Sequence, residues 1–143
     1  MNNLNILQEK FNSVQITNEN NLIVQSELVE ILEFLKNTPE FNFDMLTTII
    51  AVDKIERIEL IYQLYSLENK NTLNVHYYAP GVVPTVTDVY KSAYFDECEV
   101  FDLFGVNFEG NKNLKRLLLP DSWVGHPLLK NYKNTDERLA WND

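Results

Sequence analysis

The chain has 143 residues, of which 45% are hydrophobic and 23% charged, and its formal net charge at neutral pH is −9. This length corresponds to one ordinary domain, with a core large enough to be stable without disulfides. The acidic balance excludes generic nucleic-acid binding, which needs a basic surface. The one cysteine, Cys98, excludes a disulfide framework and a multi-cysteine zinc site, and it is typical of a reducing compartment.

We expect no targeting signal at the N-terminus. Residues 1–8 are rich in asparagine and lack the basic and apolar regions of a secretory signal. The longest apolar stretch, residues 45–52, is too short to cross a bilayer. We therefore expect no direct membrane span, although partners could still hold the protein on a membrane complex.

The first third of the chain predicts a short helix, two strands and a longer amphipathic helix. The short helix is expected at residues 4–12, and the strands at 13–17 and 21–25, where β-branched residues alternate. Ser26 offers an N-cap for the longer helix, and Pro39 marks its end. The apolar positions of this helix follow the spacing of a face laid on a core: Leu28, Ile31, Leu32 and Leu35.

The middle of the chain predicts β-structure. Residues 45–53 are β-branched and mostly apolar on both faces, which is typical of a buried strand. Two alternating segments follow on either side of the polar turn at 68–71, and this pattern predicts a β-hairpin. Its apolar positions are Ile58, Leu60, Tyr62, Leu64, Leu73, Val75 and Tyr77. Residues 80–84 contain Gly81 and two prolines, so a loop is expected there.

The last part of the chain changes character at Gly105. Residues 87–104 follow a helical pattern, and Gly105 is expected to end that helix as a C-cap. Beyond it there is no long regular period, which is typical of a functional or partner-bound segment. The sequence therefore predicts an α+β domain at 1–110, with a mixed, largely antiparallel sheet and packed helices. An extended irregular C-terminal segment at 111–143, expected to bind a partner, follows it.

The charge is distributed unevenly between these two parts. Residues 1–110 carry 17 acidic and 6 basic side chains, whereas residues 111–143 carry 4 acidic and 6 basic ones. Such an asymmetry indicates that the basic segment binds an acidic surface. Two interpretations stay open: the basic segment folds back on the acidic body of its own chain, or it meets a separate partner.

Candidates for catalysis are few. His76 lies on the polar face of its strand, where a solvated side chain is expected, and His126 lies in a turn. His126 could contact a partner or be hydrogen-bonded within the turn. The sequence contains no HExxH, GxSxG or GxxxxGK(S/T) motif. The acidic neighbours of Cys98 disfavour a thiolate, so a nucleophilic cysteine is not expected. We expect no catalytic, cofactor-binding or metal-binding residue in this chain.

An acidic cluster lies on the last predicted helix. Asp96, Glu99 and Asp102 repeat at i, i+3 and i+6 along one side, and like charges at this spacing repel. A basic group should lie against them, either Lys115 and Arg116 or another chain. Two other interpretations stay open: a plain solvated face, or a stand-alone enzyme that uses these carboxylates as acids, bases or ligands of a hard metal.

Three stretches carry a family resemblance: ECEVFDLFGV at 97–106, LKRLLLPDSW at 114–123 and GHPL at 125–128. Together they resemble the C-subunit family of respiratory NADH-quinone oxidoreductase (complex I). The pattern of that family is similar to E-R-E-x-x-D-(L/M)-(F/Y)-G-(I/V)-x-F-x-G-H-P-x-L-R-R-(I/L)-L, followed by W-x-G-H-P-L-R-K-D-Y. The chain departs from this pattern at the following positions: Cys98 for arginine, Asn111 and Lys112 for histidine and proline, Leu129 for arginine, and Asn131 for aspartate.

The resemblance implies a cofactor-free accessory subunit of the hydrophilic arm, on the cytoplasmic side of the membrane, in a complex that couples electron transfer from NADH to quinone with ion translocation. Fe–S clusters, flavin and quinone are then expected on partner subunits. The implied partners are the large quinone-site subunit, over which the C-terminal segment extends, and a neighbouring Fe–S subunit. The equivalent small subunit of a membrane-bound, energy-converting nickel–iron hydrogenase is the alternative.

The resemblance also implies which residues contact the partner. The candidates carried over by position are Glu97, Glu99, Asp102, Arg116, Trp123, His126 and Lys130. Trp141 is added because a tryptophan near the end of a chain makes a good buried contact at an interface.

Overall fold

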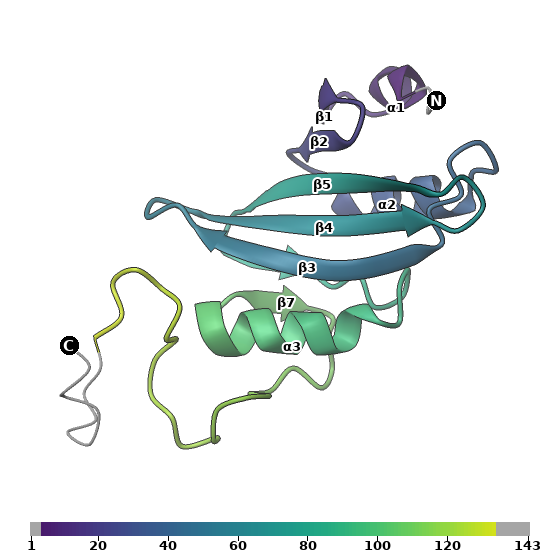
Figure 1. The fold of residues 1–143 in the computed structure, drawn as a ribbon. Coiled ribbons are helices and arrows are strands. Elements are labelled where there is room, and N and C mark those ends of the chain that lie inside the picture. Colours follow the sequence, from purple (N-terminus) through teal and green to yellow (C-terminus); the bar gives the residue numbers. More distant parts are fainter. Residues whose placement is uncertain (1–3, 134–143) are drawn as a thin grey trace.

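Five strands form the main sheet in the order β1-β2-β5-β4-β3, and a pair of short strands, β6 and β7, lies apart from it (Figure 1). The computed structural model describes residues 4–133. The elements are α1 (Asn5–Lys10), β1 (Val14–Asn18), β2 (Asn21–Val24), α2 (Leu28–Asn37), β3 (Met45–Asp53), β4 (Ile58–Ser66), β5 (Asn71–Ala79), β6 (Val82–Pro84), α3 (Ala93–Phe104) and β7 (Asn107–Glu109). None of the helices in this described part has the length and apolarity that a membrane span needs.

The predicted hairpin forms the centre of the sheet. β4 and β5 pair antiparallel over their full lengths, from Ile58 opposite Ala79 to Ser66 opposite Asn71. β3 adds to β4 antiparallel, while β2 adds to β5 in parallel. The prediction of a mixed, largely antiparallel sheet is therefore confirmed.

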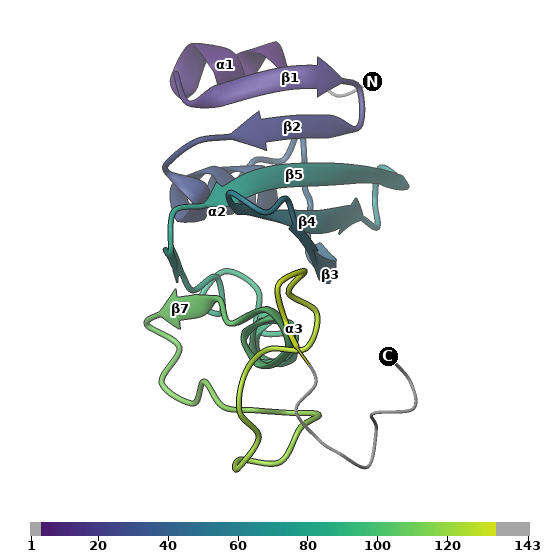
Figure 2. The ribbon, with the colours of Figure 1, turned by 90° about the vertical axis from the view of Figure 1, so that its left-hand side faces the viewer.

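One face of the sheet carries the core, and α2 packs against it (Figure 2). The side chains that alternate inward on β4 and β5 have no exposed surface at Leu60, Tyr62, Leu64, Leu73 and Val75. The predicted face of α2 meets them, because its four apolar positions are buried: Leu28, Ile31, Leu32 and Leu35. Within residues 4–133, no helix covers the opposite face of the sheet (Figure 2).

Two local predictions about the N-terminal half are wrong. Ser26 is not the N-cap of α2; that position belongs to Glu27, which has a left-handed backbone (φ 59°) and makes no side-chain capping bond. β3 is not buried on both faces, because it is an edge strand of the sheet. Its Met45 and Ile50 side chains are 42% and 43% exposed. The apolar composition of β3 therefore does not reflect full burial.

The expected loop at 80–84 and the expected helix from residue 87 also need correction. Residues 82–84 form β6, which pairs in parallel with β7, and α3 begins only at Ala93. The pairing of β6 with β7 joins segments that the whole of α3 separates, so local sequence patterns could not reveal it. The end of α3 is as predicted. Gly105 takes a left-handed conformation (φ 74°), and its N–H donates to the carbonyl oxygen of Phe101 at 2.9 Å.

The C-terminal segment follows β7. From Gly110 to Lys133 the chain forms no helix or strand, as the sequence predicts. It runs past α3, which lies beside the edge strand β3, and returns toward the sheet (Figures 1 and 2). The segment and α3 therefore lie against each other along much of the helix (Figures 1 and 2).

Candidate functional site

Asp102, near the end of α3, is the central contact of the C-terminal segment. Its side chain has no exposed surface, and its Oδ2 accepts hydrogen bonds from three consecutive backbone N–H groups, those of Leu117 (3.2 Å), Leu118 (2.8 Å) and Leu119 (3.0 Å). Its Oδ1 accepts from the Arg116 guanidinium at 2.9 Å. One carboxylate thus fixes four consecutive residues of an irregular segment.

This carboxylate is stabilised in its charged form. Burial by itself would raise the pKa of Asp102, but the Arg116 guanidinium and the three N–H donors outweigh burial and lower the pKa below its usual value. Asp102 therefore stays ionised at neutral pH. Arg116 extends the contact further along the chain, because its Nη2 donates to the carbonyl oxygen of Gly125 at 2.9 Å.

His126 packs against the end of α3. Its Nδ1 lies 2.9 Å from the backbone carbonyl oxygen of Asp102, and because a carbonyl only accepts, Nδ1 carries the proton. The ring lies directly over Gly105, where an added Cβ atom would come within 2.7 Å of the ring carbon Cδ2. Gly105 therefore has two roles: it is the C-cap of α3, and its lack of a side chain lets the His126 ring pack closely against the backbone. The His126 side chain is thus hydrogen-bonded to α3 and not within its own turn, and because it is only half-buried its contact with a partner stays a prediction.

Glu97, one and a half turns earlier on α3, ties the start of the segment to the body. Its Oε1 accepts from the N–H of Val86 at 2.8 Å, and its Oε2 accepts from Thr85 Oγ1 at 2.7 Å and Asn111 Nδ2 at 2.8 Å. Burial raises the pKa of Glu97, and these three donors partly oppose the rise. The buried carboxylate therefore joins β6, α3 and the C-terminal segment.

Cys98 and Tyr94 complete this side of α3. Both contact the carbonyl oxygen of Asn113, the Tyr94 hydroxyl at 3.2 Å and Cys98 Sγ at 3.8 Å. Cys98 has no exposed surface. The cysteine thus stands in an internal packing position.

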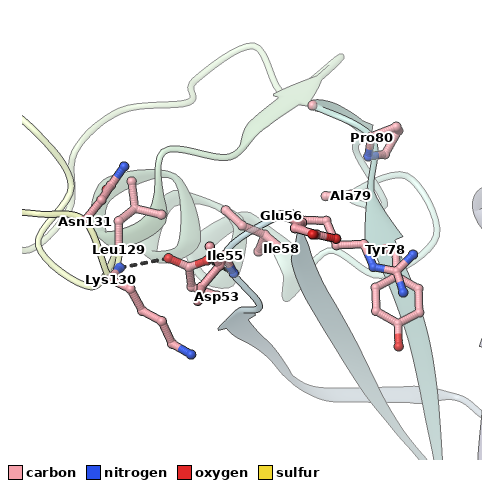
Figure 3. A pocket seen from close by; sticks show the side chains of 12 residues that line it. Asp53, Ile55, Glu56, Ile58, Tyr78, Ala79, Pro80, Leu129, Lys130 and Asn131 are labelled. Atoms are coloured by element: carbon pink, nitrogen blue, oxygen red, sulfur yellow. Dashed lines mark hydrogen bonds between the residues drawn. The ribbon is translucent and has the colours of Figure 1, made fainter.

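The far end of the segment is bonded to the end of β3 and to α3. The backbone N–H of Lys130 donates to Asp53 Oδ2 at 2.8 Å (Figure 3), and the N–H of Leu128 donates to the carbonyl oxygen of Leu103 at 3.0 Å. The bonds from Lys130 and Ile55 N–H lower the pKa of Asp53. Beside this contact, an open cavity of about 870 Å³ lies between the β3–β4 turn, the end of β5 and the segment.

This cavity holds no recognisable catalytic arrangement. Asp53 uses its two oxygens on the backbone of Ile55 and Lys130, and the Arg57 guanidinium stacks on the Tyr78 ring at 3.6 Å from its centroid. Within residues 4–133, no three His, Cys, Asp or Glu side chains are placed to hold one metal ion. The arrangement is suited to holding a chain segment in position.

Comparison with known proteins identifies the family. Residues 22–138 match the family model described as "Respiratory-chain NADH dehydrogenase, 30 Kd subunit". The chain belongs to this family. It is 40% identical over 117 residues to the NADH-quinone oxidoreductase C-subunit of Trichlorobacter lovleyi, an alignment that covers 77% of this chain and 71% of that one. It is 36% identical over 140 residues to the corresponding C-subunit of Geotalea uraniireducens, covering 88% and 83% of the two chains.

A solved structure extends the family's range. The chain matches a component of the membrane-bound sulfane sulfur reductase, an archaeal respiratory membrane complex, with a TM-score of 0.65 and 30% identity over 83% of this chain and 75% of that one. The resemblance to the C-subunit family is therefore confirmed, and the chain is a subunit of a multi-subunit respiratory complex. This match shows that the fold is not confined to NADH-quinone oxidoreductase.

The structure divides the candidate contact residues, carried over from the family pattern, into three groups. Glu97, Asp102, Arg116 and His126 hold the C-terminal segment on α3, and the first two have no exposed surface. Glu99 and Lys130 are exposed, and Trp123 is half-buried. Trp141 lies outside the described residues. Direct contact with a partner is therefore open to Glu99, Trp123 and Lys130, whereas Glu97 and Asp102 act from within.

The three acidic residues that were predicted to share one face of α3 differ in their exposure to solvent. Asp102 is buried and Glu99 is exposed, while Asp96 is half-buried. The expectation that basic side chains lie against this cluster holds for one pair, because Arg116 pairs with Asp102, whereas Lys115 forms no ion pair within residues 4–133. Sequence analysis missed Asp53 and Asn111 as contact residues, because the signal in both cases is a hydrogen bond to a distant part of the chain.

Proposed function

We propose that the protein is a cofactor-free accessory subunit in the hydrophilic arm of an NADH-quinone oxidoreductase. In this proposal it braces the large subunit of the quinone site, contacts a neighbouring Fe–S subunit, and lies peripherally on the cytoplasmic side of the membrane. The observation that carries the proposal is the way Asp102 holds an irregular, partly apolar segment in one conformation on the surface. An ordered surface segment of this kind is suited to docking against another chain.

The role of this chain would be mechanical. The complex as a whole transfers electrons from NADH to quinone and couples this to ion translocation, with flavin, Fe–S clusters and quinone on partner subunits. In this chain Glu97, Asp102 and Asp53 are all engaged by donors from the C-terminal segment. They set the shape of the docking surface, so the segment itself has less conformational freedom to lose when it binds a partner.

The same geometry weighs against a stand-alone enzyme. An acid, base or metal ligand must reach its substrate or ion, but Asp102 has no exposed surface and its oxygens are occupied by four donors. A different complex remains the second candidate, namely the small subunit of a membrane-bound, energy-converting hydrogenase or a related complex. The similarity to a component of the sulfane sulfur reductase complex supports this second candidate.

Partner identification decides between these functions. An affinity-tagged full chain is expressed from its own locus, the membranes are solubilised in mild detergent, and the retained subunits are identified by mass spectrometry. Co-purification of flavin-bearing subunits that oxidise NADH, with quinone reductase activity lost when the gene is deleted and restored by the tagged copy, is the expected result. Retention by a hydrogenase large subunit without NADH-oxidising subunits would support the second candidate. Recovery of the chain alone, with a bound metal ion lost on Asp102→Asn, would contradict both.

A further inference from the structure

The acidic body and the C-terminal segment are joined mostly by uncharged donors. Asp53 accepts from the backbone N–H of Lys130, and Glu97 accepts from the Asn111 amide. Asp102 accepts from three backbone N–H groups in addition to the Arg116 guanidinium. Arg116 is the one cation of residues 111–133 that forms an ion pair in the described structure. The segment folds back on its own body, yet most of its positive charge takes no part in the contact.

Four lysines of the segment point to solvent instead. Their side chains are exposed and form no ion pair within residues 4–133: Lys112, Lys115, Lys130 and Lys133. Lys130 contacts Asp53 mainly through its backbone, because its N–H binds that carboxylate (Figure 3), whereas its ammonium forms no ion pair with Asp53 and only adds to the lowering of the pKa of Asp53. In the same range of sequence the one acidic residue is Asp121. The outer surface of the segment is therefore strongly basic on a chain whose net charge is −9.

Exposed apolar side chains lie between these lysines along the segment. Leu118 is 63% exposed, Val124 is 86% exposed and Leu128 is 52% exposed. The backbone is fixed at two of these positions, because the N–H groups of Leu118 and Leu128 bond to Asp102 and to the carbonyl oxygen of Leu103, respectively. Because an ordered backbone loses little further backbone entropy on binding, Leu118 and Leu128 are suited to act as central contacts of an interface.

We propose that residues 111–133 form a preformed docking surface for a protein partner whose matching surface is apolar at its centre and acidic around it. This inference rests on the proposed function and adds the chemistry of the partner. The lysines would speed association and fix its register, while Leu118, Val124 and Leu128 would supply most of the affinity. A protein is favoured over an anionic bilayer, since residues 1–110 carry 17 acidic and 6 basic side chains and would be repelled by anionic lipid.

A charge-reversal pair tests the lysines. The full-length chain carrying Lys115→Glu and Lys130→Glu is compared with a matched control, Lys70→Glu and Lys91→Glu, in which exposed lysines of the body are reversed. Each labelled protein is titrated with solubilised membrane complex from a strain lacking the chain, and separately with protein-free vesicles of anionic phospholipid. We expect association of the first pair to be about tenfold weaker at low salt, with the difference shrinking as salt rises. The control should bind like the unaltered chain.

A cross-link then locates the partner surface. A photo-reactive phenylalanine analogue placed at Val124, which is exposed and makes no bond to the body, is incorporated into the full chain, and the cross-linked peptide is identified by mass spectrometry. We expect a peptide with apolar residues flanked by Asp or Glu. Changing those acids to Lys should restore binding of the Lys115→Glu, Lys130→Glu chain. Failure of this rescue, or a peptide with basic flanks, would overturn the inference.

The outcomes separate the inference from the proposed function. If the chain assembles with NADH-oxidising subunits but the reversed pair binds as well as the control, the inference is wrong and the proposed function stands. If charge reversal weakens binding to a complex that oxidises no NADH, the inference stands and the proposed function is wrong. If unaltered chain binds anionic vesicles as tightly as the complex, and charge reversal abolishes that binding, a membrane surface replaces the protein partner and the inference is overturned.

Discussion

Asp102 and Arg116 are 14 residues apart in the chain, and their side chains meet at 2.9 Å between Oδ1 and Nη1, where the Asp102 side chain has no exposed surface and the Arg116 side chain is 13% exposed. The pair joins α3 to a segment that has no regular structure of its own. A buried ion pair is weak evidence for stability by itself, since desolvation offsets much of the attraction. Here the carboxylate has three further N–H donors, so its loss would leave several buried groups without partners.

Substitution of Asp102 should loosen the C-terminal segment. Asp102→Asn removes the charge that Arg116 and the backbone donors face, and we expect a loss of about 2–4 kcal/mol in the free energy of unfolding. Amide hydrogen exchange of Leu117, Leu118 and Leu119 should accelerate more than exchange in β4 and β5. Asp96→Asn is the matched control, because burial and the neighbouring Glu99 raise the pKa of Asp96 and its charge is not needed there. Equal effects of the two substitutions would contradict the role given to Asp102.

The same carboxylate predicts how the segment responds to acid. The pKa of Asp102 is lowered in the folded chain, so its contribution to stability is fully present above the unfolded value of about 3.9 and is lost as the pH falls through the lower folded value. With Trp141→Phe, fluorescence reports Trp123 alone, which lies half-buried in the segment. Glu97, whose pKa is raised by burial and which binds Asn111 of the same segment, is expected to titrate at higher pH, so the test is the part of the signal that changes below about pH 4. We expect that part to be absent from Asp102→Asn, and its persistence in this variant would count against this account.

Gly105 should be sensitive to the smallest possible side chain. A Cβ atom there would lie 2.7 Å from the His126 ring, and φ is 74°, which disfavours L side chains. We expect Gly105→Ala to cost about 2–3 kcal/mol through the combined clash and backbone strain. In the double variant with His126→Ala the clash is absent, so the cost of the alanine should fall to about 1 kcal/mol, the backbone term alone. Additive effects in this double-mutant cycle, measured by urea unfolding, would show that the ring is not the obstacle.

Two buried tyrosines offer a matched comparison inside the body. The Tyr90 hydroxyl donates to the carbonyl oxygen of Phe43 at 2.7 Å, whereas the Tyr62 hydroxyl has no hydrogen-bond partner among residues 4–133. Tyr90→Phe should therefore cost about 1 kcal/mol, while Tyr62→Phe should be neutral or stabilising by up to about 1 kcal/mol. Thermal unfolding followed by circular dichroism measures both. A loss at position 62 equal to that at position 90 would indicate a partner that the hydroxyl finds in solution.

The secondary structure could be predicted well wherever local periodicity carried the information. The alternation in β4 and β5 and the i, i+3, i+4, i+7 spacing in α2 each specify one buried face, and both were predicted correctly. The prediction that β3 is buried on both faces was wrong, because its apolar residues resemble those of a buried strand although the strand order places it at the edge. Strand order and the β6–β7 pair depend on contacts between distant residues, which a local pattern does not encode.

Four properties of this protein follow from residue types and their local order: the class of fold, the break at Gly105, the contrast between an acidic body and a basic C-terminal segment, and the family. How the charge contrast is used depends on contacts that form only in the folded chain. The body's carboxylates Asp53, Glu97 and Asp102 bind mainly uncharged donors of the segment and leave its lysines facing outward. A net charge counts side chains but does not say which atoms are in contact. A carboxylate that is buried on folding needs hydrogen-bond donors that are buried with it, and backbone N–H groups meet this need at a lower desolvation cost than a lysine ammonium.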